Sequence, residues 1–235
     1  MSLVALAVAA ALLALERAVY VVIARAPDAF RALCARPAVA RHGDPIAIVE
    51  KLFYAFKALQ LAVFGAWCYV HGGGSLIPVH RNPLVFGLAA VLVVAGQILN
   101  VTVFYRLGRT GVFFGDRLGY GVRRCRTFPF SVLSHPQYVA TLLTIWGFFL
   151  AARFPHGDWY ALPVLETAYY AAGAWLEGAA VRTLGDGVAF ATGRLTVAVI
   201  RRFATGVIEP HRSCDTGLIR PRNRQEGRTE DPVGK

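Results

Sequence analysis

Five long apolar stretches dominate the chain, and shorter polar segments separate them. A helix needs about 20 residues to cross the hydrocarbon core of a bilayer. We expect transmembrane helices over residues 3–24, 46–70, 84–104, 135–152 and 159–176. The pattern therefore predicts an all-α, polytopic integral membrane protein with about five transmembrane helices.

The composition favours the same class. Hydrophobic residues make up 56% of the 235 residues and charged residues 17%, whereas soluble domains contain about 45–50% and 25%. The four cysteines lie far apart and the six histidines show no metal-binding spacing. A disulfide scaffold and a zinc site are therefore not expected.

The net charge of +11 comes mainly from arginines, and arginine-rich polar segments alternate with arginine-poor ones along the chain. Four lie in 25–45, one in 71–83, six in 105–137 and one in 153–158. By the positive-inside rule, this places the N-terminus on the exoplasmic or lumenal side, and the 25–45 and 105–137 loops and the C-terminus in the cytosol. The charge thus indicates topology, and no motif for nucleic-acid binding accompanies it.

The chain divides into a membrane domain, residues 1–177, and a basic cytosolic tail, residues 178–235. In the tail, residues 195–208 are apolar but interrupted by two arginines, which favours a surface helix over a sixth span. Beyond Pro210 the composition is typical of a disordered segment.

The loop after the third apolar stretch is rich in glycine. Gly108, Gly111, Gly115 and Gly119 recur at three- and four-residue spacing, which on a helix would form one face without side chains. Such a face allows another helix or a flat ligand to approach the backbone closely. Helix packing is the simpler interpretation of the spacing alone.

Further chemistry surrounds these glycines. The loop contains Asp116 and the aromatic residues Phe113 and Phe114, and it leads through a Phe-Pro-Phe segment into the turn Ser134-His135-Pro136-Gln137-Tyr138. The Leu-Gly-x-x-Gly-x-x-x-Gly-Asp pattern precedes these segments. The order and spacing of these motifs resemble those of the phospholipid N-methyltransferases. The likeness covers about residues 84–177, and the His-Pro-x-Tyr turn more distantly resembles the isoprenylcysteine carboxyl methyltransferases.

The resemblance implies S-adenosylmethionine as cofactor and methylation of phosphatidylethanolamine, or its mono- and dimethylated forms, in phosphatidylcholine synthesis. It implies cofactor contacts from the glycines, where Gly96 keeps one glycine of the family's first motif, and from Tyr138 and Glu177. The implied cofactor residues are Gly96, Gly108, Gly111, Gly115, Tyr138 and Glu177. For the lipid headgroup and phosphate, the candidates are Arg123, Arg124, Arg126 and Tyr138.

Methyl transfer to an amine is an in-line displacement, so it depends mainly on positioning. The sulfonium favours aromatic faces or an acid nearby, and the ammonium must lose a proton before it attacks. We rank Glu177 first as the base, His135 second and Asp116 third. Helix initiation is an alternative for His135, and pairing with a nearby arginine is an alternative for Asp116.

Two other functions remain open from the sequence. One is methylation of a prenylcysteine carboxylate or another lipophilic acceptor, and the other is a non-enzymatic membrane protein whose glycines only pack helices. The charged residues within the apolar stretches are interpreted as structural pairs. The resemblance favours the endoplasmic reticulum, or the inner membrane if the chain is bacterial, with lipid entering from the bilayer.

Overall fold

The computed structural model describes residues 2–74, 82–122, 125 and 127–183. Within these ranges the regular structure is helical and no strand is present, which confirms the predicted all-α class. The helices are α1 (Leu3–Arg25), α2 (Pro27–Cys34), α3 (Pro37–Ala40), α4 (Pro45–His71), α5 (Pro83–Val112), α6 (Pro136–Ala152) and α7 (Ala161–Thr183). The tail predicted at 178–235 lies mostly outside the described residues.

Proline fixes where three of the long helices begin. Pro45, Pro83 and Pro136 each occupy the first turn of their helix, where the missing N–H removes no helical hydrogen bond. The Asp44 carboxylate caps α4 by accepting a hydrogen bond from the Ala47 N–H at 2.7 Å. These starts lie within one residue of the expected ones, while α5 and α7 run eight and seven residues beyond the expected ends, 104 and 176.

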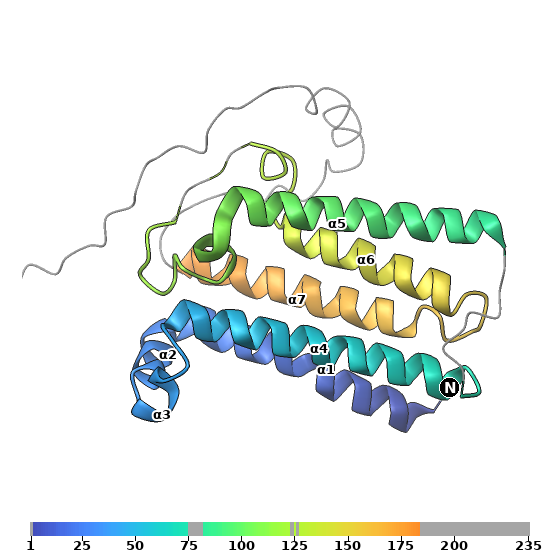
Figure 1. The fold of residues 1–235 in the computed structure, drawn as a ribbon, viewed down its shortest axis with the longest axis horizontal. Helices are drawn as coiled ribbons and strands as arrows, with labels where there is room; N and C mark the ends of the chain where they lie inside the picture. Colours follow the sequence, from blue (N-terminus) through green and yellow to red (C-terminus); the bar gives the residue numbers. More distant parts are fainter. Residues whose placement is uncertain (1, 75–81, 123–124, 126, 184–235) are drawn as a thin grey trace, which may run out of the picture.

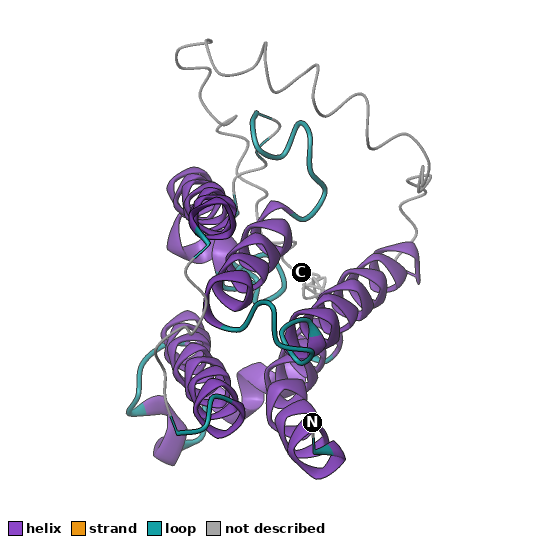
Figure 2. Ribbon diagram, turned by 90° about the vertical axis from the view of Figure 1, so that its right-hand side faces the viewer, coloured by secondary structure: helices purple, strands orange, loops and turns teal. Residues whose placement is uncertain are grey.

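The five long helices lie side by side, and consecutive ones run in opposite directions (Figure 1). Figure 2 shows the bundle from the end where the N-terminus lies, and α1 packs against α4. Helix α5 packs chiefly against α6, and α7 packs against both α1 and α6. The core that joins α1, α4, α6 and α7 includes Leu13, Phe64, Trp67, Phe149, Leu162 and Tyr170.

Two glycines allow α5 and α6 to approach closely. A Cβ on Gly96 would lie 2.6 Å from the Ala140 carbonyl oxygen and 2.5 Å from Thr144 Oγ1. A Cβ on Gly147 would lie 2.8 Å from the Ala89 carbonyl oxygen. The close approach therefore requires glycine on both helices, as in membrane-protein packing through small residues.

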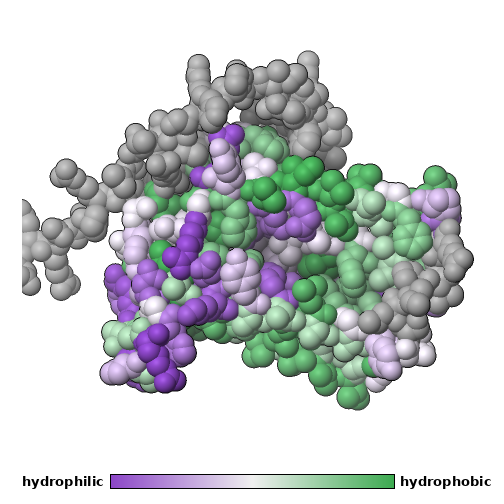
Figure 3. All heavy atoms as spheres, viewed as in Figure 1, coloured by the Kyte–Doolittle hydropathy of each residue, from purple (hydrophilic) through white to green (hydrophobic). Residues whose placement is uncertain are grey.

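The outer faces of the bundle are apolar. Large hydrophobic side chains on α1, α4 and α5 are exposed, among them Leu3, Leu61, Leu84, Val91, Ile98 and Val101. Hydrophilic residues instead gather at the end formed by α2, α3 and the 113–120 segment (Figure 3). Contiguous apolar surface of this kind marks contact with lipid or with another protein. Helices α1 and α5 have the length and composition to cross a membrane, and α6 is apolar but has only 17 residues.

A buried ion pair closes the opposite end of the bundle. Arg153 donates to both carboxylate oxygens of Asp158, at 3.0 and 2.7 Å, and to the His71 carbonyl oxygen at 2.9 Å. Trp67 Nε1 donates to the same carboxylate at 3.0 Å. Burial alone would raise the pKa of Asp158, but the hydrogen bonds and the charge of Arg153 outweigh it and hold that pKa below its ordinary value. The cluster fixes the α6–α7 loop to the end of α4.

Candidate functional site

A cavity of about 470 Å³ lies toward the polar end of the bundle. Its wall is built from the C-terminal halves of α1 and α5, the N-terminal parts of α4 and α6, the 113–117 turn and Tyr170 of α7. The volume falls in the range of small-molecule sites, about 300–1,000 Å³. Two predicted cytosolic loops lie at this same end, residues 25–45 and 105–137, and together they contain ten arginines (Figure 1).

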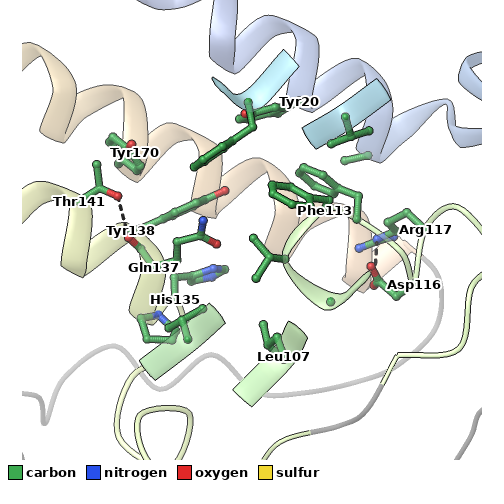
Figure 4. A pocket seen from close by; sticks show the side chains of 18 of the residues that line it. Tyr20, Leu107, Phe113, Asp116, Arg117, His135, Gln137, Tyr138, Thr141 and Tyr170 are labelled. Atoms are coloured by element: carbon green, nitrogen blue, oxygen red, sulfur yellow. Dashed lines mark hydrogen bonds and ion pairs between the residues drawn. The ribbon is translucent and has the colours of Figure 1, made fainter. Parts of the chain in front are cut away.

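Aromatic rings make up much of the cavity wall. Tyr138 extends toward the middle of the cavity from α6, with Phe113 opposite it (Figure 4). The Tyr138 ring stacks on His135 at a centroid distance of 5.4 Å and meets Tyr170 edge-on at 5.1 Å. Tyr20 and Phe114 continue the surface at 5.6 Å from each other. Such a surface suits a cation, because aromatic faces attract positive charge.

A polar network borders the aromatic wall inside the bundle. Lys57 Nζ lies 3.2 Å from a carboxylate oxygen of Glu16, and donates to Gln60 at 3.0 Å and to the Tyr170 hydroxyl at 3.4 Å. Gln60 in turn donates to Glu166 at 2.7 Å. Glu16, Gln60 and Glu166 are all buried. The network joins α1, α4 and α7 beside the cavity.

From the sequence alone, these charges are interpreted as structural pairs and belong to no predicted site. The pairing is present, but Glu16, Arg17, Lys57, Tyr20 and Tyr170 also line the cavity. The position of these charges within apolar spans could have indicated a site. An ionisable residue inside an apolar span is costly and usually faces a functional cavity.

The predicted glycine face is wrong as a single helical surface. Gly108 interrupts α5 with φ 64° and ψ −179°, a backbone conformation that is essentially restricted to glycine. The helix ends at Val112, and Gly119 lies in a turn with φ 84°. Of the four glycines, Gly111 is the one that lines the cavity. Gly115 lies where a Cβ would meet the Thr110 side chain and carbonyl, so it serves the turn.

Two of the three candidate bases lie at the cavity wall. His135 precedes α6 and lines the cavity. Asp116 lies at the edge with its side chain 59% exposed, 3.8 Å from Arg117 (Figure 4). Its contact with Arg117 matches the alternative interpretation, a partner to an arginine of the same loop.

The remaining candidates lie elsewhere. The Glu177 backbone is in α7, two helical turns beyond Tyr170 toward the polar end. Gly96 lies at the contact of α5 with α6. Arg123, Arg124 and Arg126 lie outside the described residues.

The fold and the cavity together define a helical bundle with apolar outer faces and an aromatic, partly charged cavity at its polar end. Residues 84–184 match the family model described as phospholipid methyltransferase. Over this region the chain is similar to that family, which confirms the predicted resemblance. No solved structure matches the chain.

Named relatives agree with the family. A phosphatidyl-N-methylethanolamine N-methyltransferase of Arabidopsis thaliana is 30% identical over 109 residues, 45% of this chain and 57% of the relative. A phosphatidylethanolamine N-methyltransferase of Rattus norvegicus is 36% identical over 74 residues, 31% of this chain and 37% of the relative. A phosphatidyl-N-methylethanolamine N-methyltransferase of Saccharomyces cerevisiae is 35% identical over 71 residues, 30% and 34%. The chain thus spans less than two thirds of each of these relatives.

The matched region supplies only part of the cavity. Residues 84–184 contain α5, the 113–117 turn, α6 and α7, and therefore Gly111, Phe113, His135 and Tyr138. The α1 and α4 side of the wall lies outside the match.

Proposed function

We propose that this protein methylates the amine of phosphatidylethanolamine, or of its mono- and dimethylated forms, with S-adenosylmethionine as methyl donor. The observation that carries the proposal is that the region matching the phospholipid methyltransferase family also builds the aromatic half of the cavity. The named relatives act on the same class of lipid.

We propose that α1, α4, α5, α6 and α7 all cross the bilayer, with the polar end of the bundle in the cytosol. The exposed apolar faces on α1, α4 and α5 support membrane embedding. The arginines of the 25–45 and 105–137 loops support the orientation. The C-terminus would then be cytosolic, and a eukaryotic chain of this family would reside in the endoplasmic reticulum. A cavity at this end is open to a soluble cofactor and to lipid arriving sideways from the leaflet.

The residues of the cavity fit a sulfonium cofactor and a headgroup ammonium. When bound, S-adenosylmethionine supplies an electrophilic methyl group. Tyr138, Tyr20 and Phe113 offer ring faces on which a cationic centre is stabilised. Each ring packs against another aromatic side chain, Tyr138 against Tyr170, Tyr20 against Phe114 and Phe113 against Phe53. The rings are therefore fixed before any ligand arrives, and nucleophile and methyl carbon would be held in line at little further cost.

The headgroup ammonium must lose a proton before the lone pair of its nitrogen can attack the methyl group. We retain Glu177 as the first candidate base and His135 as the second. Glu177 lies toward the polar end of α7, and His135 lies against Tyr138 at 5.4 Å between centroids. Asp116 is third, because its carboxylate is exposed and close to Arg117. A base contributes about 10²–10⁴-fold to such a step.

The test is methyl transfer by the full-length protein in membranes. Labelled S-adenosylmethionine and phosphatidylethanolamine vesicles are added, and the extracted lipids are separated by headgroup. Label is expected in mono-, di- or trimethylated ethanolamine lipids, and its absence from all three refutes the proposal. Phosphatidylcholine vesicles are the acceptor control, since a trimethylated amine cannot accept another methyl group.

Two variants then separate the candidate bases. Glu177→Gln is expected to lower kcat by at least about 100-fold, with kcat measured at saturating S-adenosylmethionine because the family resemblance also implies a cofactor contact for Glu177. His135→Gln is expected to lower it less. The reverse order would make His135 the base, and full activity of both variants would exclude both residues. Retained activity of Glu177→Gln on a carboxylate acceptor would instead favour a prenylcysteine-type substrate.

A further inference from the structure

Arg17 is a partly buried arginine of the cavity wall for which the proposed reaction assigns no role. It lies in α1, eight residues before the helix ends at Arg25, or about 12 Å along the axis. Its side chain is 12% exposed and lines the cavity. It also lies outside residues 84–184, so the family match does not account for it.

Three tyrosines surround the guanidinium group. Its central carbon is 3.8 Å from the centroid of the Tyr170 ring, 5.7 Å from that of Tyr138 and 5.9 Å from that of Tyr20. A guanidinium is planar and its N–H groups point outward in that plane. Packing against the Tyr170 ring at 3.8 Å therefore restricts its orientation and leaves the N–H edge as the part that binds. Tyr138 and Tyr20 are farther from the guanidinium and also line the cavity.

The N–H edge is poorly satisfied within the described residues. The nearest carboxylate, Glu16, lies 3.4 Å from an Arg17 terminal nitrogen, and Lys57 lies 3.2 Å from the same oxygen. One carboxylate thus serves two cations, while Glu166 is hydrogen bonded to Gln60. Arg17 Nε is buried without a hydrogen-bond partner. A buried donor left in this state is unfavourable, so a ligand that satisfies it gains affinity.

We propose that Arg17 binds an oxyanion of the ligand held in this cavity. Two parallel N–H groups of an arginine match two oxygens of a carboxylate or a phosphate. Both groups occur in the proposed reaction, as the carboxylate of the cofactor's amino-acid part and the phosphodiester of the lipid. The inference rests on the proposed function, and it assigns the anion subsite to α1 beside Tyr138.

The test measures binding, so that it does not depend on turnover. S-adenosylhomocysteine and dihexanoyl phosphatidylethanolamine are titrated separately into detergent-solubilised, full-length protein. Arg17→Gln removes the charge and the paired donors, Arg17→Lys keeps the charge alone, and Arg25→Gln removes an exposed charge from the end of the same helix. A charge-assisted hydrogen bond is worth about 1.5–3 kcal/mol, or roughly 10- to 150-fold in affinity.

Arg17→Gln is expected to lower the affinity for one of the two ligands by this factor, while Arg25→Gln lowers the affinity for neither. A loss confined to S-adenosylhomocysteine identifies the carboxylate as the partner, and a loss confined to the lipid identifies the phosphate. Methylthioadenosine, which lacks the carboxylate, and dihexanoylglycerol, which lacks the phosphate, are expected to bind Arg17→Gln and wild type equally. If Arg17→Gln does not fold, Arg17→Lys is expected to show a smaller loss in the same direction.

The failures are distinguishable. If wild type binds both ligands and the Arg17 variants bind them as tightly as Arg25→Gln does, the role of Arg17 is refuted and the proposed function stands. Binding of neither ligand to the wild-type protein overturns both proposals. Equal losses for ligands with and without the anion would show that Arg17 only supports the fold.

Discussion

Substituting Gly96 by alanine separates helix packing from cofactor contact at a position where the family resemblance implies a cofactor residue. The added Cβ would lie 2.6 Å from the Ala140 carbonyl oxygen and 3.0 Å from the Thr144 backbone nitrogen. These are backbone atoms of α6, so a side-chain rotation cannot relieve the contact. We therefore expect α5 and α6 to be forced apart.

The matched control is Gly87→Ala on the same helix, where a Cβ would meet nothing within 4 Å. Alanine in place of glycine stabilises a helix by about 0.5–1 kcal/mol, and this gain is common to both variants. The difference between them therefore reports the packing contact, for which overfilling costs about 1–3 kcal/mol. For a chain of this length, that corresponds to a midpoint roughly 2–12 °C lower for Gly96→Ala.

The assay is thermal unfolding of the purified protein in one detergent, followed by titration of S-adenosylhomocysteine into the folded variants. Gly96→Ala is expected to melt below Gly87→Ala. If the two melt together and Gly96→Ala alone binds the ligand more weakly, the packing argument is refuted. Gly96 then contacts the cofactor, as the resemblance implies.

Three further predictions concern the kink, the distal ion pair and the aromatic wall. Gly108→Ala places a side chain at φ 64° and ψ −179° and is expected to cost about 1–3 kcal/mol, measured as a lower midpoint than Gly87→Ala. Asp158→Asn leaves Arg153 buried without its charge partner and is expected to cost about 3–5 kcal/mol at pH 7. Because the folded-state pKa of Asp158 is lowered, its stabilisation is complete above the ordinary value of 3.8 and is lost as the pH falls through the folded-state pKa, so midpoints of variant and wild type should converge there. Tyr138→Leu is expected to weaken binding of the cationic cofactor by about 0.5–2 kcal/mol while Tyr138→Phe retains it, and equal affinities for all three proteins would contradict the aromatic role.

The long helices were predictable because each is a long apolar stretch bounded by proline or charge. The sequence expectations missed the last eight residues of α5 because Arg106, Arg109 and two glycines make that segment polar. Tertiary contact accounts for it: Arg109 donates to Glu50 of α4 at 2.6 Å. That partner is 59 residues away in sequence and carries no local signal.

The candidate site was only partly predictable for the same reason. Gly111, His135 and Tyr138 belong to a contiguous pattern and were found from it. The Glu16–Lys57 contact joins residues 41 positions apart, and Gln60 links Lys57 to Glu166 by hydrogen bonds. Spacing along the chain does not reveal such a network, and it emerges only when α1, α4 and α7 are packed together.

The cavity wall is built partly by the region that matches the family and partly by α1 and α4, so both parts of the chain would take part in catalysis. The matched region supplies the glycine, the histidine and most of the rings, whereas Glu16, Arg17 and Lys57 come from α1 and α4. An in-line methyl transfer needs few reacting side chains and depends on orientation. The helices that hold charge beside the rings would thus contribute to positioning together with those that carry the motifs. The residues of the family motifs therefore form only part of the candidate site, because α1 and α4 are needed to enclose the cavity.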